Sequence, residues 1–534
     1  MDEVSDAGPG LRGWPGLRGR LIWAVALAVA SGCLFYCYLL QSRTGGVDSD
    51  AASNALQAWD MLHGNPLLRG WWLSDVSFYT TELPEYALVE WVHGLRPDDV
   101  HICAAITYTL LVLLTALVAR GTARGREGIV RALLGGGIMV APEIGGPTNT
   151  LLGSPDHTGT GVPIMLVFLL LDRIRPCWYL PPVIFVLLTW VQVADTLATV
   201  AAAAPIVLVC LVRAGLWLLP SRRTAPAWYD LGLVVAAGGS VPVARQVLAI
   251  IASHGGFAVH PLPGALLASS SVLPHQLRVV GLCVLILFGA DLIAQAPGLA
   301  MSAAGLHMAG LALAGAGLLA GLWRFFARDT ERVTQLLVTA ILATLAAGWL
   351  GTHVTSGFSA HEIAVVLPFG AALAGRMLGG PIARARIAGP AVLGAVLAAY
   401  LAALGFACSQ PAIPVPNQSL ADWLVAHHLT SGLGGYWQAD SVTLDSGGKV
   451  TVAGIYGGSP STWEAKAGWY DASSRSANFV VMVSEPAAQA VLTKPVVMRR
   501  VFGRPVRTYT FQQYTVMVYN KNLLTDLMPF GATG

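Results

Sequence analysis

Residues 47–66 read V-D-S-D-A-A-S-N-A-L-Q-A-W-D-M-L-H-G-N-P and follow the first long apolar segment of the chain. The two carboxylates of this stretch, Asp48 and Asp50, lie a few residues beyond the end of that segment. A charge at the edge of the hydrocarbon layer is costly unless it has a use. The following residues predict a helix that ends at Gly64 and Pro66. Both acids therefore lie at a helix N-terminus, where the backbone dipole favours the ionised carboxylate.

Composition predicts a polytopic membrane protein. The 534 residues are 55% hydrophobic and only 11% charged, whereas about a quarter of the residues in a soluble globular domain are charged. The net charge is only +3, and the arginines form short clusters between apolar runs. This pattern argues against nucleic acid as a partner and indicates that the arginines set the membrane topology. All four lysines follow residue 440, so the C-terminal part differs in character from the rest.

The apolar runs predict about 11–13 transmembrane helices within residues 1–410. The first run, 21–40, is longer than the core of a signal peptide, so we interpret it as a retained helix with a cytoplasmic N-terminus. Arginine clusters then place 120–127 and 324–332 inside. A count of twelve spans disagrees with this pattern, because it would place residues 324–332 outside the cytoplasm. A re-entrant or interfacial helix at 277–294 restores agreement with eleven spans, and a split elsewhere that gives thirteen would do the same.

Residues 254–276 are expected outside the cytoplasm, and so are two longer regions. The first is the loop 41–100, the largest between helices. The second is residues 415–534, where the apolar runs stop after a proline-rich segment and alternating patterns begin. We predict a small extracytoplasmic α+β domain here, which binds an acceptor or partner and does no chemistry. Its expected elements are a helix after Ser419 and strands at 441–444, 449–452, 478–483, 506–511 and 514–519.

The acid pair and the residues after it carry a resemblance to a known family. A cytoplasmic N-terminus, one span, and an outer loop that opens with two acids and continues A-x-x-M-L-x-G-x-P resemble the GT-C membrane glycosyltransferases. The similarity is greatest to the branch that contains protein O-mannosyltransferases and lipid A aminoarabinose transferases. The matching residues are Asp48, Asp50, Ala58, Met61, Leu62, Gly64 and Pro66. Here the second acid stands one residue further on than in the common adjacent D-E pair, so the roles of the two acids are open to exchange.

The resemblance implies transfer of a sugar, with inversion, from a polyprenyl-phosphate donor to a glycan, lipid or protein acceptor at the outer face of the cytoplasmic membrane. Such a transfer needs a carboxylate to take the proton of the acceptor hydroxyl, and polar groups to stabilise the departing phosphate. We expect Asp48 to be that base. Asp50 would orient the acceptor or share a divalent cation with Asp48, and no other cofactor is implied. The structural alternative is a helix cap with a solvated neighbour.

Five further residues are candidates for substrate binding. Asp156 and His157 lie in an S-P-D-H-T-G loop on the outer side, and Asp195 lies at an outer turn where a charge needs a partner or a cavity. Arg278 suits a lipid phosphate at the interface, and Glu82 lies in the first outer loop. Each has a structural alternative, such as a turn residue satisfied by local hydrogen bonds or an arginine that snorkels.

Two other functions are compatible with a membrane protein of this composition. A transporter or flippase of lipid-linked sugars would be expected to show inverted repeats and charged, broken helices near the bilayer midplane. A non-catalytic protein of envelope assembly would not need an acid pair beside the membrane. The ionisable residues instead gather at the outer edge, which favours a reaction there.

Overall fold

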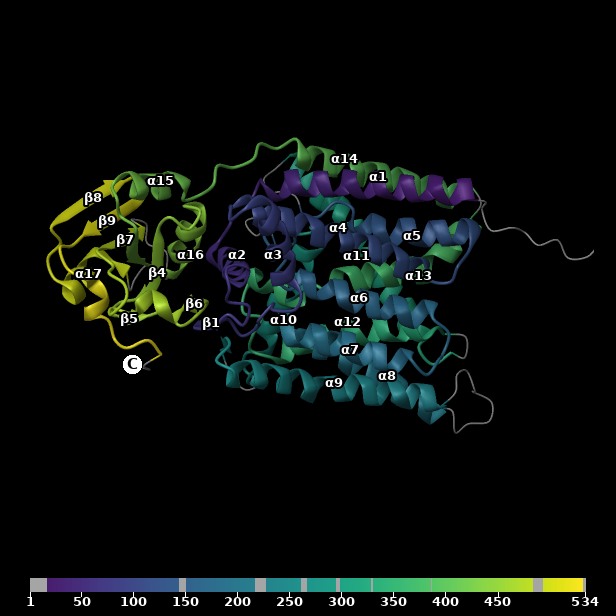
Figure 1. Cartoon of the computed structure of the whole chain (residues 1–534). Helices are drawn as coiled ribbons and strands as arrows, with labels where there is room; N and C mark the ends of the chain where they lie inside the picture. The colour runs from purple at the N-terminus through teal and green to yellow at the C-terminus, as the bar shows by residue number, and fades with distance from the viewer. Residues whose placement is uncertain are drawn as a thin grey trace, which may run out of the picture.

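The computed structural model contains a bundle of long helices and, at one end of it, a smaller part that holds a β-sheet (Figure 1). The structure describes residues 17–143, 150–216, 227–260, 267–293, 298–327, 330–385, 387–483 and 493–531. We call the end of the bundle beside the sheet the domain end, and the other the distal end. Arg328, where the sequence places a cytoplasmic loop, lies outside the described residues.

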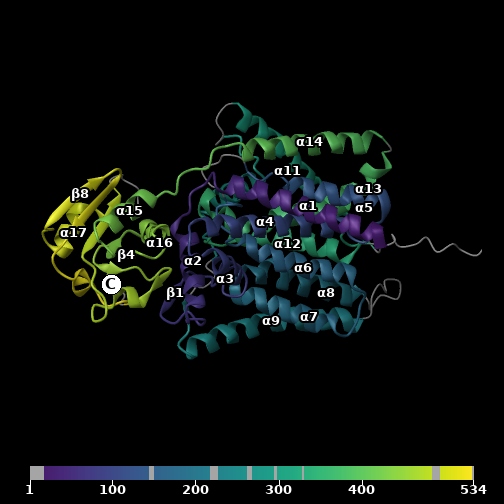
Figure 2. The same ribbon diagram turned by 45° about the horizontal axis from the view of Figure 1, so that its top comes forward.

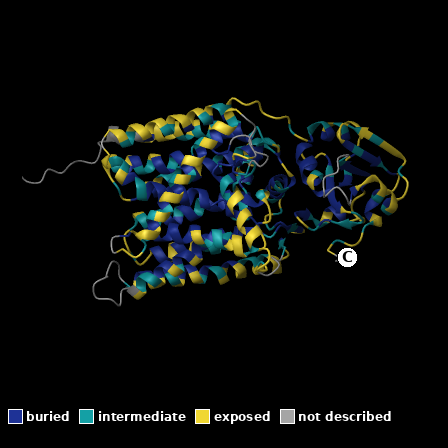
Figure 3. Cartoon of the chain, turned by 180° about the vertical axis from the view of Figure 1, so that it is seen from behind, coloured by how far each residue is buried: buried dark blue, intermediate teal, exposed yellow. Residues whose placement is uncertain are grey.

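The bundle confirms the polytopic helical membrane protein expected from the sequence. By length and composition, seven of the described helices can cross a membrane: α1, α4, α9, α11, α12, α13 and α14. Shorter helices pack among them, and many residues of α1 and α9 are exposed. Figure 3 shows exposed residues along the edges of the bundle. The bundle elements are α1 (Leu17–Ser42), α4 (Asp98–Arg120), α5 (Gly125–Met139), α6 (Thr158–Arg173), α7 (Leu180–Ala194), η1 (Thr199–Ala203), α8 (Ala204–Leu216), α9 (Ala227–Ser253), α10 (Leu273–Leu287), α11 (Leu299–Trp323), α12 (Arg332–Leu350), η2 (Gly357–Ile363), α13 (Val366–Arg384) and α14 (Ala388–Cys408).

Small residues set how closely the central helices approach. A Cβ atom added to Gly135 of α5 would lie 2.5 Å from the Cβ of Ala119 in α4. One added to Gly375 of α13 would lie 2.6 Å from the carbonyl oxygen of Arg131. Because lipid gives no hydrophobic drive for helix association, such close packing is a main source of stability in a membrane bundle.

Helix α10 covers part of the segment expected to be re-entrant. It has 15 residues, whereas α11 after it has 25. Its first residue, Leu273, accepts a hydrogen bond from Trp349 at the end of α12. Just beyond its last turn, the carbonyl of Gly289 bonds to His307 of α11. The helix therefore starts at the domain end and stops earlier than the predicted 277–294, leaving Asp291 in the bend that follows.

Buried ion pairs join the helices at the distal end. Arg376 of α13 donates to Asp172 of α6 at 2.7 Å and contacts Glu331, which precedes α12. Arg332 donates to Asp230 at the start of α9 at 2.6 Å. These pairs show that the connections before α9 and before α12 lie at the same end of the bundle.

The first loop folds onto the domain end. It contains α2 (Ser49–Leu62), β1 (Trp71–Leu73) and α3 (Glu82–His93). Helix α2 ends as the sequence predicts: His63 caps it, and Gly64 follows with a φ of +95°, a conformation that glycine adopts at little cost. Figure 2 shows α2 and α3 between the bundle and the sheet-containing part.

The C-terminal part contains a six-stranded sheet in the order β5-β4-β3-β7-β9-β8. Strand β3 runs parallel to β4 and β7, and the other neighbours are antiparallel. The elements are α15 (Gln418–Ala426), β3 (Ser431–Gly434), α16 (Tyr436–Asp445), β4 (Thr451–Tyr456), β5 (Ser459–Pro460), β6 (Ala465–Lys466), η3 (Ala467–Tyr470), β7 (Phe479–Val483), α17 (Pro495–Phe502), β8 (Arg507–Phe511), β9 (Tyr514–Val518) and η5 (Leu523–Asp526).

The strand predicted at 441–444 is wrong, because these residues belong to α16. The helix packs against both β4 and α2, so most of its positions are buried on more than one side. Burial of this kind removes the polar face from which a helical period could be recognised.

A second, small sheet ties the C-terminal part to the first loop. Strand β1 pairs in parallel with β2 (Ala258–Val259) and antiparallel with β6. Beside it, Lys466 of β6 donates to both carboxylate oxygens of Asp60 in α2 at 2.8 and 2.9 Å. The first loop and the C-terminal part therefore contact each other through backbone pairing and an ion pair.

Candidate active site at the domain end

Asp48 is both a helix cap and an accessible carboxylate. Its Oδ1 accepts a hydrogen bond from the backbone N–H of Ala51 at 3.0 Å, which is the cap that the sequence left open as an alternative. The residue nevertheless stays exposed. Crowding by surrounding protein atoms raises the pKa of Asp48, although the backbone N–H groups act against that change. Asp48 is therefore a carboxylate that water or a substrate can reach.

Asp50 belongs to a group of acids around one tyrosine. The hydroxyl of Tyr436 contacts Oδ1 of Asp50 and lies 2.7 Å from Oε2 of Glu464. One hydroxyl carries a single hydrogen, so a second proton must be shared for both contacts to be favourable. Burial, together with the charge of Asp48, raises the pKa of Asp50 to about 7. Burial likewise raises the pKa of Glu464 well above its usual range.

The C-terminal part contributes residues to this group of acids. Tyr436 and Glu464 come from that part, and so does Asp440, which is 2% exposed and whose pKa is raised by burial and by the charge of Asp50. Sequence reasoning missed all three, since 386 residues separate Tyr436 from Asp50. The sequence pattern that could have indicated these residues is the presence of acids close to aromatic residues in Y-W-Q-A-D (436–440) and T-W-E (462–464).

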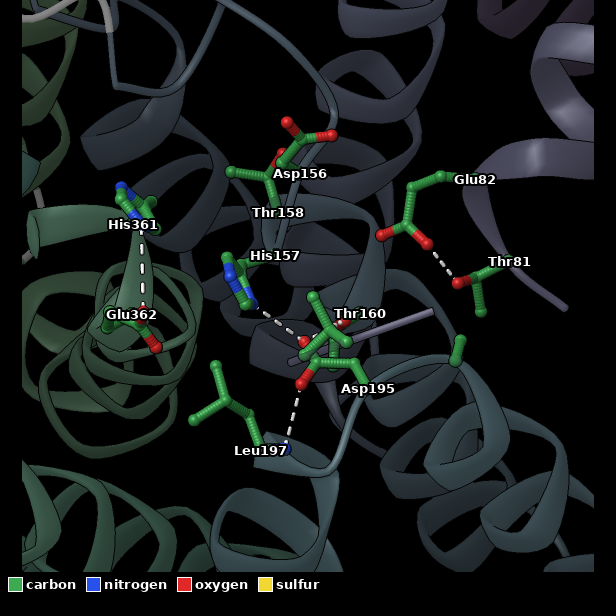
Figure 4. A network of polar contacts seen from close by, with 12 residues as sticks. Thr81, Glu82, Asp156, His157, Thr158, Thr160, Asp195, Leu197, His361 and Glu362 are labelled. Carbon is green, nitrogen blue, oxygen red and sulfur yellow. Dashed lines mark hydrogen bonds and ion pairs between the residues drawn. The ribbon is translucent and has the colours of Figure 1, made fainter. Parts of the chain in front are cut away.

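Asp156 lies close to the two acids of the first loop, as the sequence suggested. Asn54 of α2 donates to its Oδ1 at 2.8 Å, and the charge of Asp48 adds to burial in raising the pKa of Asp156 to about 6. Glu82 is 1% exposed, and its side chain contacts Thr81 (Figure 4). A Cβ atom at Gly159 would lie 2.3 Å from Oε1 of Glu82, so only glycine lets this acid approach the start of α6.

His157 and Asp195 form a buried ion pair (Figure 4). The His157 Nδ1 lies 2.9 Å from Oδ2 of Asp195, which also accepts a bond from the Thr160 hydroxyl at 2.6 Å. The other oxygen of Asp195 accepts the backbone N–H of Leu197 at 2.8 Å. His157 has a φ of +57°, a left-handed conformation that costs about 1–3 kcal/mol and often marks a functional site. The loop thus holds this imidazole in one place.

The charge on His157 depends on its partner. Burial lowers the pKa of His157, but the Asp195 carboxylate outweighs that effect and raises it to about 10. In turn, burial would raise the pKa of Asp195, and the facing imidazolium instead holds it below its usual range. The pair is therefore ionised at neutral pH.

His361 and Glu362 approach His157 from η2. The two imidazole rings stack with their centroids 5.2 Å apart, and His361 Nε2 lies 3.7 Å from Oε1 of Glu362. One ligand atom from each of the three residues lies within 4.8 Å of the others, which makes them the candidate metal site among the described residues. Asp48 and Asp50, the metal ligands considered from the sequence, are not in this group. The signal for His361 and Glu362 was an ionisable pair at the start of an apolar run.

A cavity opens next to this group. It encloses about 650 Å³ of empty space, counting the solvent at its mouth. Its polar residues include Asp75, His157, His353 and Glu362, whereas the walls from η1 and α12 are mainly apolar. Arg278 is exposed on α10 and is not part of the lining. The structure thus brings four of the substrate-binding candidates (Asp156, His157, Asp195 and Glu82) to the domain end near the acid pair, and it leaves Arg278 outside this cavity.

The His157–Asp195 pair predicts a pH-dependent stability. A histidine whose pKa rises from 6.5 to about 10 on folding adds stability that is fully present below pH 6.5. That stability is lost as the pH rises through about 10. We expect the melting temperature of the protein in detergent with a chelator to fall between pH 7 and 10, and the Asp195→Asn variant to lose this slope. A parallel decline in both proteins would contradict the ion pair.

The fold and this group of residues define a polytopic membrane protein whose ionisable side chains converge at one end of a helical bundle. No family model matches the sequence, and no curated protein matches it either. Solved structures do match. The chain is similar to ArnT from Cupriavidus metallidurans bound to undecaprenyl phosphate, with 12% identity and a TM-score of 0.54 over 95% of this chain and 99% of that chain.

The apo structure of the same ArnT matches at 11% identity with a TM-score of 0.55, over 96% of this chain and all of that chain. The archaeal oligosaccharyltransferase AglB from Archaeoglobus fulgidus is more distant, with 11% identity and a TM-score of 0.48 over 87% of this chain and 70% of that chain. The chain therefore has the GT-C fold of membrane glycosyltransferases, as the motif after the first span predicts.

Proposed function

We propose that this protein is an inverting glycosyltransferase that takes a sugar from a polyprenyl-phosphate donor. The observation that carries the proposal is the combination of an accessible carboxylate, Asp48, with a mainly apolar cavity nearby that is polar at one side. The GT-C fold supports it, and so does the undecaprenyl phosphate bound to the similar ArnT.

The cavity suits a donor with two unlike parts. Its apolar walls would take the first isoprene units, and the imidazole of His157 would face the phosphate. Because Asp195 keeps that imidazole charged, it would stabilise the negative charge that develops as the bond to the sugar breaks.

Asp48 acts as the base in this scheme. It takes the proton of an acceptor hydroxyl while the hydroxyl oxygen attacks the anomeric carbon from the side opposite to the phosphate. The new C–O bond forms as the bond from that carbon to the phosphate oxygen breaks, and its electron pair leaves with the polyprenyl phosphate. Asp50, held by Tyr436, would orient the acceptor.

A divalent cation fits one place in the site. His157, His361 and Glu362 would hold it, with Asp195 behind His157 fixing the ring in the way that carboxylates orient metal-bound histidines. Such a cation would supply positive charge to the donor phosphate. Binding would require His157 without a proton on Nε2, so the ion would displace that proton while Nδ1–H stays bonded to Asp195.

The arginines indicate the orientation in the membrane. Arg120, Arg173, Arg213, Arg332 and Arg376 lie in the distal halves of their helices or at their distal ends. In membrane proteins, arginine and lysine are in excess on the cytoplasmic side. We therefore place the distal end in the cytoplasm, with the active site and residues 415–534 on the outer side of the cytoplasmic membrane.

The proposal is tested with purified protein, a polyprenyl-phosphate sugar labelled in the sugar, and a panel of glycan, lipid and peptide acceptors. We expect labelled product with an inverted anomeric centre. Movement of the intact labelled lipid across proteoliposome membranes, without any transfer or hydrolysis, would instead support the transporter alternative.

Filling the cavity should weaken donor binding. In a Val200→Trp variant, the indole would occupy space between η1 and α12, and overpacking of this size costs about 1–3 kcal/mol. We expect an increase of about 5- to 150-fold in the dissociation constant for the donor. Leu208→Trp is the matched control, because Leu208 is 53% exposed on the outside of α8. Equal donor binding by both variants would place the donor elsewhere.

A further inference from the structure

Three aromatic side chains of the C-terminal part stay unusually exposed. Trp437 is 39% exposed, Tyr456 is 38% and Trp463 is 37%. Among residues 418–483 and 493–531, the other Trp, Tyr and Phe side chains are less exposed, and most of them are buried. Exposed aromatic rings next to a group of polar side chains can mark a binding surface.

Two of the rings are chain neighbours of residues in the Asp50 group. Trp437 follows Tyr436 at the start of α16, and Trp463 precedes Glu464. Tyr456 lies at the end of β4, and its pKa is raised first by burial and then by the charge of Asp50.

The two indoles are held in place. Trp437 packs edge-on against Tyr436 with ring centroids 5.2 Å apart. Trp463 packs against His260 at 5.5 Å, and His260 is itself fixed by a 2.8 Å bond between Nε2 and the carbonyl of Thr462.

The backbone at Trp463 supports the same arrangement. Glu464 has a φ of +48°, a left-handed conformation that a residue with a side chain rarely adopts, and it is only 4% exposed. Strain of this kind persists where the surrounding structure requires it. Here it accompanies an acid that is buried against Tyr436 and an indole next to it that stays at the surface.

We propose that Trp437, Tyr456 and Trp463, together with Asp50 and Glu464, form an acceptor site for a neutral carbohydrate. The inference rests on the proposed glycosyl transfer and names the class of its acceptor. A sugar ring has an apolar C–H face that an aromatic ring can cover, and hydroxyl groups at its edge that carboxylates can accept. An acceptor that carries phosphate would be repelled by the negative charge of Asp48.

Direct binding tests this site. Full-length protein in detergent is titrated by calorimetry with neutral oligosaccharides of arabinose, mannose, galactose and glucose. We expect at least one to bind, and Trp437→Ala and Trp463→Ala each to weaken binding by about 2- to 10-fold, the range of one aromatic contact. Trp437→Phe and Trp463→Phe should restore most of the affinity. Trp178→Ala, at an 80% exposed position outside this surface, should leave it unchanged.

Donor hydrolysis without an acceptor separates this inference from the function on which it rests. If the parent and the tryptophan variants hydrolyse a polyprenyl-phosphate sugar equally, and only transfer to the oligosaccharide has a raised KM in the variants, both statements hold. If hydrolysis occurs but no oligosaccharide binds, or the variants bind it as the parent does, the carbohydrate site is wrong. Binding of a peptide or an anionic lipid, without binding of any neutral oligosaccharide, would also show that the carbohydrate site is wrong. If the parent neither hydrolyses nor transfers, the proposed function fails.

Discussion

Asp48→Asn is expected to slow single-turnover sugar transfer by about 10²–10⁴-fold, the usual cost of removing a general base. Asparagine can still accept the hydrogen bond from the N–H of Ala51, so α2 should keep its cap. Donor binding should therefore stay near the parent value, and the loss should fall on the rate. Transfer of a labelled sugar in a rapid-quench experiment measures this directly.

Two comparisons make the Asp48 result specific. Asp422→Asn removes an exposed acid of α15 that accepts a hydrogen bond from Gln418 and does not belong to the Asp50 group, and it should not change the rate. Asp50→Asn should raise the acceptor requirement more than it lowers turnover, because Asp50, which contacts Tyr436, would orient the acceptor and not take its proton. If Asp48→Asn transfers sugar at nearly the parent rate, the base is another residue, and Asp156 is the next candidate.

Arg376→Met is expected to be the most destabilising single change, at about 3–5 kcal/mol. The guanidinium is 4% exposed and bonds to Asp172, the carbonyl of Val118 and Glu331, so it joins α4, α6 and α12 to α13. Methionine fills a similar volume but leaves Asp172 buried without its cation. The measurement is unfolding in detergent, followed by helical content.

Matched variants separate loss of charge from loss of packing at this position. Arg384→Met removes an exposed arginine at the end of the same helix and should change stability little. Asp172→Asn combined with Arg376→Met should recover part of the loss, since no unpaired buried charge then remains. An Arg376→Met protein as stable as the Arg384→Met protein would show that the buried ion pairs do not hold the distal end together.

The sequence predicted those features that depend on local pattern. The helix after Asp48 and its end before Gly64 follow from a capping residue and a breaker, and both are present. The three last strands also lie close to their expected ranges, because short runs rich in β-branched and aromatic residues are a local signal.

The rest depends on contacts between residues far apart in the chain. Nothing near Asp50 in sequence indicates Tyr436, which reaches it only because α16 packs on α2. The helix α16 itself was predicted in part as a strand, since its burial on several sides hides the helical period. Likewise, His361 meets His157 through the turn η2, inside a region that hydropathy alone assigns to a span.

The central claim is that the cavity beside His157 holds a polyprenyl-phosphate donor, and the lipid that co-purifies with the protein tests it most directly. Mass spectrometry of the parent protein should detect a polyprenyl phosphate or its glycoside, with the mass difference identifying the sugar. The same lipid should be depleted from Val200→Trp and retained by Leu208→Trp. Detection of ordinary phospholipids alone, in equal amounts in all three proteins and even after incubation with added polyprenyl phosphate, would contradict the claim.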